Sequence, residues 1–265
     1  MNIEEIASEV SSSISLAKQI EPFSKRGLVL SLQEAYDVAG IVRQKLGQTK
    51  IIGRKIGFTN RNIWNIYDVD QPIWGPITTN SVSFFETNLL KIDLSQFCEP
   101  RIEPEIVVCL KQKPKNGSEN PEIYLDWVAP GFEIVDSIYP NWKFSLTDAI
   151  VSGGLHGCLA VGKKFKVNDR TERDLINVGV SLYRGGKLEE EGTGANVLDG
   201  PVSAIGYLHS GLSKIKNQDF LSAGDIITTG TMTDAKPIYP NEKWIAKFDG
   251  VVEAELNLEF FNKLT

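Results

Sequence analysis

The sequence RIEPEIVVCL at residues 101–110 predicts a buried β-strand that carries two carboxylates on one face. Side chains alternate between the two faces of a strand, so Glu103 and Glu105 point the same way. Two like charges among aliphatic neighbours repel each other and are costly to desolvate. A hard divalent cation such as Mg²⁺ prefers carboxylate oxygens and removes both problems. The pattern therefore indicates a possible metal site on this strand.

The same residues allow a simpler interpretation. The segment could be the acidic end of a strand at a sheet edge, where Arg101 pairs with the carboxylates and Pro104 is tolerated. Like-charged neighbours on a strand are uncommon but not rare. Spacing alone leaves both interpretations open.

A third carboxylate, Glu133, lies in the apolar segment GFEIVDS at residues 131–137. A single carboxylate in a strand often caps or pairs with a neighbouring group. Together with Glu103 and Glu105 it would complete a three-carboxylate site. Such a site suits Mg²⁺ or Mn²⁺ and does not suit zinc, which prefers nitrogen and sulfur ligands.

Lys55 lies in GRKIGFT at residues 53–59, with a glycine on each side. The glycines indicate a turn or close backbone packing. The lysine could bind an anionic substrate group or carry a proton. The alternative is a solvated lysine in a basic hairpin.

Asp70 precedes Pro72 in a turn-like segment. Its ordinary role is turn formation, and its functional role would be a contact to substrate or to a residue beside it.

His156 lies in SGGLHG at residues 152–157, where three glycines surround it. This composition is typical of an irregular, closely packed segment that a ligand can approach. The side chain could be a general acid or base, or a structural histidine with satisfied hydrogen bonds.

Composition limits the function classes. The 265 residues are 42% hydrophobic and 23% charged, with a net charge of −6, which argues against nucleic acid or an anionic membrane as partner. No apolar run approaches the ~20 residues that span a bilayer. The acidic N-terminus lacks a secretory pattern, and three cysteines without metal-like spacing fit a reducing, cytoplasmic location.

Periodicity divides the chain into two parts. Residues 2–19 and 31–46 show helical spacing, and Ser31 with Glu34 forms a capping box. From about residue 50 the pattern changes to short strands with Gly and Pro between them. Pro201 could open a helix over 202–212, Asp249-Gly250 predicts a tight hairpin turn, and residues 114–121 predict a polar loop. We expect a helical region at 1–50 and a β-rich body at 51–265, integrated into one domain.

Six ordered motifs, which cover nearly the whole chain, resemble one family. They are GRKIGFT (53–59), VDQPIWG (69–75), RIEPEI (101–106), FEIVDS (132–137), GTGANVLDGP (192–201) and AGDIITTGTMT (223–233). The sequence resembles the 2-hydroxypenta-2,4-dienoate hydratase / 4-oxalocrotonate decarboxylase family of the fumarylacetoacetate hydrolase superfamily.

The resemblance implies an α+β fold, a mixed β-sheet roll of the fumarylacetoacetate hydrolase C-terminal type with a small helical N-terminal part. It implies a Mg²⁺ or Mn²⁺ site at Glu103, Glu105 and Glu133, an active-site lysine at Lys55, and homo-oligomers. The implied function is a metal-dependent lyase on 2-oxo acids or 2-hydroxydienoates in aromatic catabolism, foremost a 2-hydroxypenta-2,4-dienoate hydratase. Decarboxylation of a 2-oxo-enedioate, C–C hydrolysis of an acylpyruvate with His156 as base, and a catalytically silent member are the alternatives.

The chain departs from the hydratase pattern at two places. Ile73 stands where an acid is expected after the proline of VDQP, and residues 152–157 stand where an Asp-Asn-Ala-Ser-like run is expected. Both departures replace groups that would handle water or substrate protons, and neither touches the three carboxylates.

Overall fold

The computed structural model describes residues 1–48, 50–115 and 121–263, which form two β-sheets and a set of covering helices. The helices are α1 (Ile3–Ser15), α2 (Leu32–Lys45), α3 (Trp64–Tyr67), α4 (Pro121–Tyr124), α5 (Leu146–Val151), α6 (Thr171–Ile176) and α7 (Pro201–Lys214). The strands of the larger sheet are β1 (Ile51–Gly57), β2 (Ile73–Thr78), β3 (Val82–Phe84), β5 (Pro100–Leu110), β6 (Leu125–Asp136), β7 (His156–Val161), β8 (Phe165–Lys166), β11 (Ile226–Thr231) and β12 (Lys236–Pro237). Those of the smaller sheet are β4 (Leu89–Asp93), β9 (Gly179–Arg184), β10 (Lys187–Thr193), β13 (Lys243–Phe248) and β14 (Ala254–Phe261).

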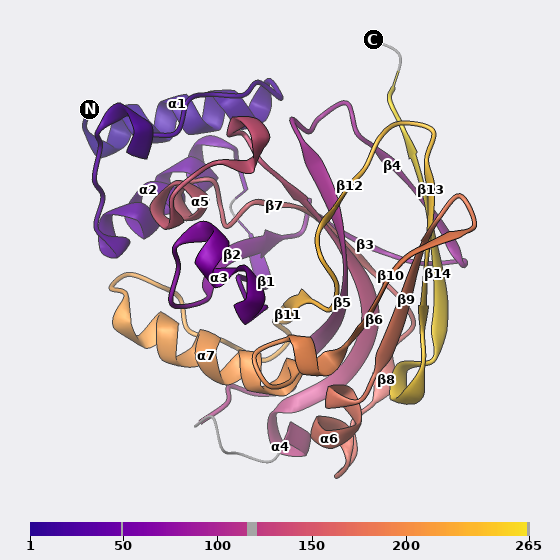
Figure 1. The fold of residues 1–265 in the computed structure, drawn as a ribbon. Coiled ribbons are helices and arrows are strands. Elements are labelled where there is room, and N and C mark those ends of the chain that lie inside the picture. The colour runs from indigo at the N-terminus through magenta and orange to yellow at the C-terminus, as the bar shows by residue number, and fades with distance from the viewer. Residues whose placement is uncertain (49, 116–120, 264–265) are drawn as a thin grey trace.

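The larger sheet is mixed and runs in the order β2-β1-β11-β5-β6-β7-β3, with β12 paired to β5 and β8 to β6. The smaller sheet runs in the order β10-β9-β13-β14-β4. Figure 1 shows the smaller sheet on one side of the long strands β5 and β6, and α1, α2 and α5 on the other side. This arrangement is an α+β fold.

Strand β5 is central, and its alternation is the one that the sequence predicts. Ile102, Ile106 and Val108 are fully buried in the main hydrophobic core. Val107, on the opposite face, belongs to a smaller apolar cluster. Glu105 shares that face with Val107, so the carboxylates point away from Ile102, Ile106 and Val108.

The edge-strand interpretation of residues 101–110 is wrong. β5 pairs with β6 along its length on one side and with β11 and β12 on the other. Pro104 is tolerated because the pairing with β11 shifts register between Thr228 and Thr231, before β12 takes over at Ile102. A proline lacks the N–H that an uninterrupted ladder would need.

Two predicted helices begin where their sequence signals lie. Ser31 caps α2, and its side chain and that of Glu34 form the reciprocal hydrogen bonds of a capping box. Pro201 stands at the first position of α7, which extends to Lys214. The first helix is shorter than expected, because α1 ends at Ser15 rather than near residue 19.

The C-terminal hairpin is present, but its connection differs from the predicted tight turn. β13 and β14 pair antiparallel, with Phe248 opposite Ala254. The residues between them include a 3-10 turn at Gly250–Val252, so Asp249-Gly250 starts a longer connection. The predicted polar loop at 114–121 falls largely on residues 116–120, which lie outside the described residues.

The N-terminal helices pack on the body through the same apolar core. Ile6 and Val10 of α1 and Val38 of α2 are buried in the cluster that also contains Trp244 and Leu258 of the smaller sheet. Among the described residues, no helix is both long and apolar enough to cross a membrane. The division at residue 50 stays a prediction.

Candidate active site

Three carboxylates meet on the face of the larger sheet opposite the one that carries Ile102, Ile106 and Val108. Glu103 and Glu133 are direct cross-strand partners on β5 and β6, and Glu105 follows on the same face of β5. One oxygen from each lies within 4.8 Å of the others. Like charges directly opposite each other destabilise a sheet, so this arrangement needs a compensating charge.

Two oxygens of this cluster are buried without a hydrogen bond. Glu105 Oε2 accepts a hydrogen bond from the backbone N–H of Gly230 at 2.8 Å, and Glu105 Oε1 has no partner. Glu133 Oε1 lies 2.7 Å from His156 Nδ1, and Glu133 Oε2 has no hydrogen-bond partner. Buried polar atoms nearly always form hydrogen bonds, so two carboxylate oxygens without one indicate a place where a ligand binds. Their hardness and spacing fit a divalent cation such as Mg²⁺ or Mn²⁺.

The positive charge beside the three carboxylates comes from Lys55. Its Nζ lies 3.4 Å from Glu133 Oε2, and the residue is only 3% exposed. The alternative of a solvated lysine is therefore wrong, because β1 is an internal strand between β2 and β11. Glycine at position 53 is required, since a Cβ there would collide with the backbone of Ile226 on the parallel neighbour β11.

Burial and mutual repulsion perturb the pKa values in the cluster. Burial raises the pKa of Glu103 to about 7 and raises that of Glu105 well above its usual value, and the neighbouring carboxylate Glu133 adds to both shifts. Burial also disfavours the charged forms of Glu133 and Lys55, but other charges outweigh it. Lys55 and the hydrogen bond from His156 lower the pKa of Glu133, and the three carboxylates together raise the pKa of Lys55. Perturbed groups of this kind concentrate at functional sites.

The cluster opens into a cavity of about 460 Å³, a volume typical of small-molecule sites. Lys55 and Glu103 line its inner end. Much of its lining is apolar and is made by Phe58, Ile63, Ile66, Tyr67, Ile73, Trp142, Phe144 and Leu155. The polar residues of the lining include Arg101, Thr231, Thr233, Asp234 and Lys236.

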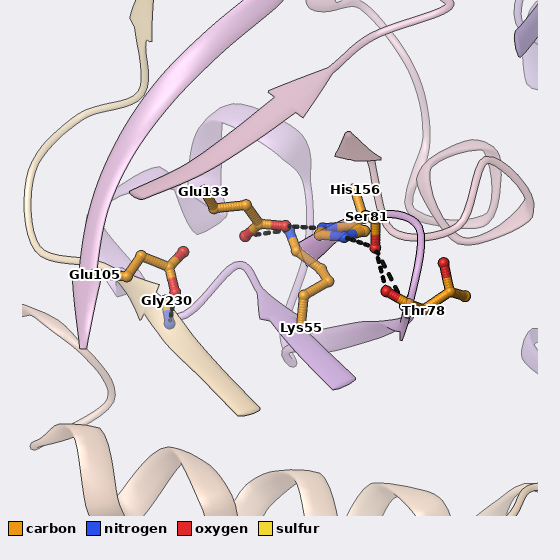
Figure 2. A network of polar contacts seen from close by, with 7 residues as sticks. All are labelled: Lys55, Thr78, Ser81, Glu105, Glu133, His156 and Gly230. Carbon is orange, nitrogen blue, oxygen red and sulfur yellow. Dashed lines mark hydrogen bonds and ion pairs between the residues drawn. The ribbon is translucent and has the colours of Figure 1, made fainter. Parts of the chain in front are cut away.

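His156 lies behind the cluster and not on the cavity wall. Its two ring nitrogens contact Glu133 and Ser81, as Figure 2 shows, and its side chain is 6% exposed. Its preceding residue, Leu155, does line the cavity. Both ring nitrogens have hydrogen-bond partners. This agrees with the second alternative from the sequence, a structural histidine whose hydrogen bonds are all made.

Asp70 is not brought to the cluster. It is exposed, in a bend after α3, and it does not line the cavity. The bend before Pro72 agrees with its turn-forming alternative.

Several residues of the site were not identified from the sequence. Gly230 donates through its backbone, and Ser81 contacts a histidine that lies 75 positions away in the chain. Arg101 was considered only as a pairing partner, whereas its guanidinium stacks 4.1 Å from the Trp142 ring centroid and lines the cavity. Of these residues, only Gly230 had a signal in the sequence, namely the glycine itself in the TTGT stretch at 228–231. Its φ of +111° is a conformation that glycine adopts readily.

Comparison with known proteins decides the family. A 4-oxalocrotonate decarboxylase from a Pseudomonas species is 31% identical over 191 residues, which cover 71% of this chain and 71% of that protein. The chain belongs to the 2-hydroxypenta-2,4-dienoate hydratase / 4-oxalocrotonate decarboxylase family. No protein-family model matches the sequence.

Other members of this hydratase/decarboxylase family match more of the chain. The 2-hydroxyhexa-2,4-dienoate hydratase of Comamonas testosteroni is 26% identical over 89% of this chain and 88% of its own length. The solved structure of 4-oxalocrotonate decarboxylase from Pseudomonas putida G7, complexed with magnesium and adipate, superposes with a TM-score of 0.86. That pair is 25% identical and covers 97% of both chains.

Proposed function

We propose that the protein is a divalent-metal-dependent lyase that acts on 2-hydroxydienoates and their 2-oxo tautomers, in the catabolism of aromatic compounds. Glu103, Glu105 and Glu133 would hold the metal ion. The observation that carries this proposal is the pair of buried, unpaired carboxylate oxygens beside a substrate-sized cavity. The related enzymes of the family, which are hydratases and decarboxylases, support it.

A bound Mg²⁺ or Mn²⁺ supplies Lewis acidity toward the carboxylate and 2-oxygen of a 2-oxo acid. Lys55 then stands at the same end of the cavity, where its ammonium neutralises negative charge on the 2-oxygen or gives up a proton from Nζ. The apolar lining lowers the local dielectric constant and so strengthens these electrostatic interactions. Ile73, which lines the cavity, offers no proton to the distal carbons.

The reaction that we propose first is hydration. The dienoate takes up a proton at C5 while its 2-hydroxyl releases one, which gives the 2-oxo-3-enoate, and water then adds its hydroxyl to C4 and a proton to C3. C–C hydrolysis with His156 as the base has less support. The ring is hydrogen-bonded to Glu133 and Ser81, and it does not border the cavity. A silent, metal-binding protein also has less support, because the three carboxylates lie together, Lys55 pairs with one of them, and Lys55 and Glu103 line the cavity.

The decisive experiment is proton NMR of the protein with Mg²⁺ and a panel of substrates, with EDTA as control. The panel contains 2-hydroxypenta-2,4-dienoate, a 2-oxo-enedioate, oxaloacetate and an acylpyruvate. We expect metal-dependent conversion of the dienoate or the enedioate, and the product identifies the reaction. Turnover that survives EDTA, or no turnover of any compound by the metal-loaded protein, would contradict the proposed function.

Decarboxylation is a second candidate, favoured by Arg101. Among the described residues no carboxylate forms an ion pair with this guanidinium, which lines the cavity two positions along β5 from Glu103. A substrate held at its 2-oxo acid end would present a distal carboxylate to this wall. In decarboxylation the bond to that carboxylate breaks, CO₂ leaves, and the electron pair moves along the conjugated chain to the 2-oxygen.

Replacing Arg101 by Leu tests this second candidate. For a 2-oxo-enedioate we expect KM to rise at least ~10-fold, because a charge-assisted hydrogen bond contributes roughly 1.5–3 kcal/mol. For the monocarboxylate 2-hydroxypenta-2,4-dienoate KM should change less than ~3-fold. Arg101→Lys, which keeps the charge, is the matched control. Equal effects on both substrates would remove the argument for decarboxylation.

Metal affinity should depend on pH through Glu103. Burial raises the pKa of this carboxyl from 4.5 to about 7, so below pH 7 it holds a proton that the cation must displace. We expect Mn²⁺ to bind at least ~10-fold more weakly at pH 6 than at pH 8, measured by electron paramagnetic resonance. For the metal-free protein the sign is opposite: a raised carboxyl pKa means that folded-state stability is lost as pH rises from 4.5 toward 7. An affinity that is constant over this range would contradict the argument.

Four finer points are also part of this proposal. We propose that residues 1–50 form the small helical part of a β-roll of the fumarylacetoacetate hydrolase C-terminal type. We propose Mg²⁺ or Mn²⁺ as the ion, a homo-oligomeric state and a cytoplasmic location. For the purified protein, titration with each ion would test the choice of metal, and sedimentation analysis would test the oligomeric state.

A further inference from the structure

His156 connects a candidate metal ligand to a fixed turn of the chain. Its Nδ1 lies 2.7 Å from Glu133 Oε1, and its Nε2 lies 2.9 Å from Ser81 Oγ (Figure 2). Ser81 is itself held by Thr78, whose backbone N–H donates to Ser81 Oγ at 3.1 Å. The imidazole therefore joins Glu133 to the β2–β3 turn.

The direction of these hydrogen bonds follows from the partners. An ionised Glu133 can only accept, so His156 Nδ1 carries the hydrogen and donates it to Oε1. At the other nitrogen, Ser81 can either donate its hydroxyl to Nε2 or accept from it, since its hydroxyl also has the Thr78 carbonyl at 3.2 Å as an alternative acceptor. The bond to Glu133 is the same in both arrangements, so it does not depend on the charge of the ring.

This bond decides which oxygen of Glu133 is available. Oε1 is occupied by His156, and Oε2 points toward Lys55 without a hydrogen bond. Gly230 does the same for Glu105, where its N–H occupies Oε2 and leaves Oε1 unpaired. Each carboxylate is thereby held in one orientation, with one oxygen left for a cation.

The backbone before His156 has an unusual conformation that delivers the ring to this position. Gly153, Gly154 and Leu155 all have positive φ, which for Leu155 is a strained conformation. The register between β6 and β7 then shifts between Ile134 and Val135, and the shift pairs Val135 with His156. The ring borders a small recess of about 50 Å³, which is also lined by Ile14 of α1 and by residues of α2, and it does not line the substrate cavity.

We propose that His156 is a positioning residue for the metal site: it fixes Glu133 through Nδ1–H, and Ser81 fixes its ring. This inference rests on the proposed metal-dependent function and assigns His156 a role other than that of the general base. Partners that orient metal-binding side chains typically change metal affinity by 10–100-fold when they are removed.

The test is a Mn²⁺ titration of the full chain without substrate, followed by electron paramagnetic resonance. His156→Leu removes the donor at similar size, and His156→Asn keeps an N–H donor at the position of Nδ1. We expect His156→Leu to weaken Mn²⁺ binding at least ~10-fold and His156→Asn to stay within ~3-fold of the wild type. His209→Leu, which removes the other histidine, is the matched control and should bind like the wild type.

The outcomes separate the two proposals. Wild-type protein that binds no Mn²⁺ would overturn the proposed function. Wild-type binding together with unchanged affinity in folded His156→Leu, or equal losses in the Leu and Asn variants, would overturn only the role of His156. If His156→Leu does not fold, Ser81→Ala decides: we expect it to weaken Mn²⁺ binding about 3-fold, and an unchanged affinity would overturn the proposal.

Discussion

Replacing Glu105 by Gln is expected to lower metal-dependent turnover at least ~10³-fold, which corresponds to ~4 kcal/mol of transition-state stabilisation. Glu105 is fully buried, and its free Oε1 is one of the two unpaired oxygens at the cluster. The amide keeps the shape and the contact with Gly230 but removes the negative charge that a hard cation requires. Steady-state kinetics on the substrate identified by NMR, with saturating Mg²⁺, measures the effect.

The same variant should be more stable than the wild type when both are metal-free at pH 8. Burial and the neighbouring Glu133 raise the pKa of Glu105, so its ionised form is unfavourable in the folded protein without metal. We expect a higher Tm for Glu105→Gln in EDTA and no further rise with Mg²⁺. Glu253→Gln, at an exposed position, is the control and should change neither turnover nor Tm. Wild-type activity in folded Glu105→Gln would exclude this carboxylate from the site.

Replacing Lys55 by Met is expected to lower kcat ~10²–10⁴-fold, the range for loss of a positioned acid–base group. The methionine fills a similar volume but has no charge, so the Nζ proton beside Glu133 Oε2 is lost. Metal binding should respond in the opposite direction. Lys55 competes with a cation for Glu133, so Mn²⁺ should bind Lys55→Met as tightly as the wild type or more tightly.

The opposite responses of kcat and metal affinity make the role of Lys55 testable. A parallel loss of both would show that Lys55 supports the structure of the site rather than the reaction. Lys187→Met, at an exposed position in β10, controls for the loss of a positive charge and should leave both quantities unchanged.

That Glu103 and Glu105 share a face was predictable, because strand alternation is a local rule. The position of Glu133 opposite Glu103 comes from the register of β5 against β6, which residue spacing does not give. The α2 cap was predictable for the same reason, since Ser31 and Glu34 are three residues apart. What sequence alone left open was whether Lys55 is solvated, because its burial depends on β11, a strand more than 170 positions later.

Contacts made by main-chain atoms and by distant small residues could not be predicted. Gly230 acts through an N–H that nearly every residue possesses, and Ser81 has no neighbouring signal that links it to His156. The prediction of a tight turn at Asp249-Gly250 was wrong for another reason. The dipeptide favours a tight turn, but the residues up to Glu253 form a 3-10 turn instead, because the packing around the connection overrides local preference.

The pairing of Glu103 with Glu133 across β5 and β6 means that the sheet cannot close without bringing two carboxylates together. If the proposed metal binds there, the central strands and the three carboxylates would form one cooperative unit, in which the ion would act as a ligand of the folded chain. Stabilisation by such a ligand grows with the logarithm of its free concentration, so a hundredfold excess over Kd adds about 2.7 kcal/mol. The free concentration of divalent cation around the protein would then determine the stability of the fold as well as the rate of turnover.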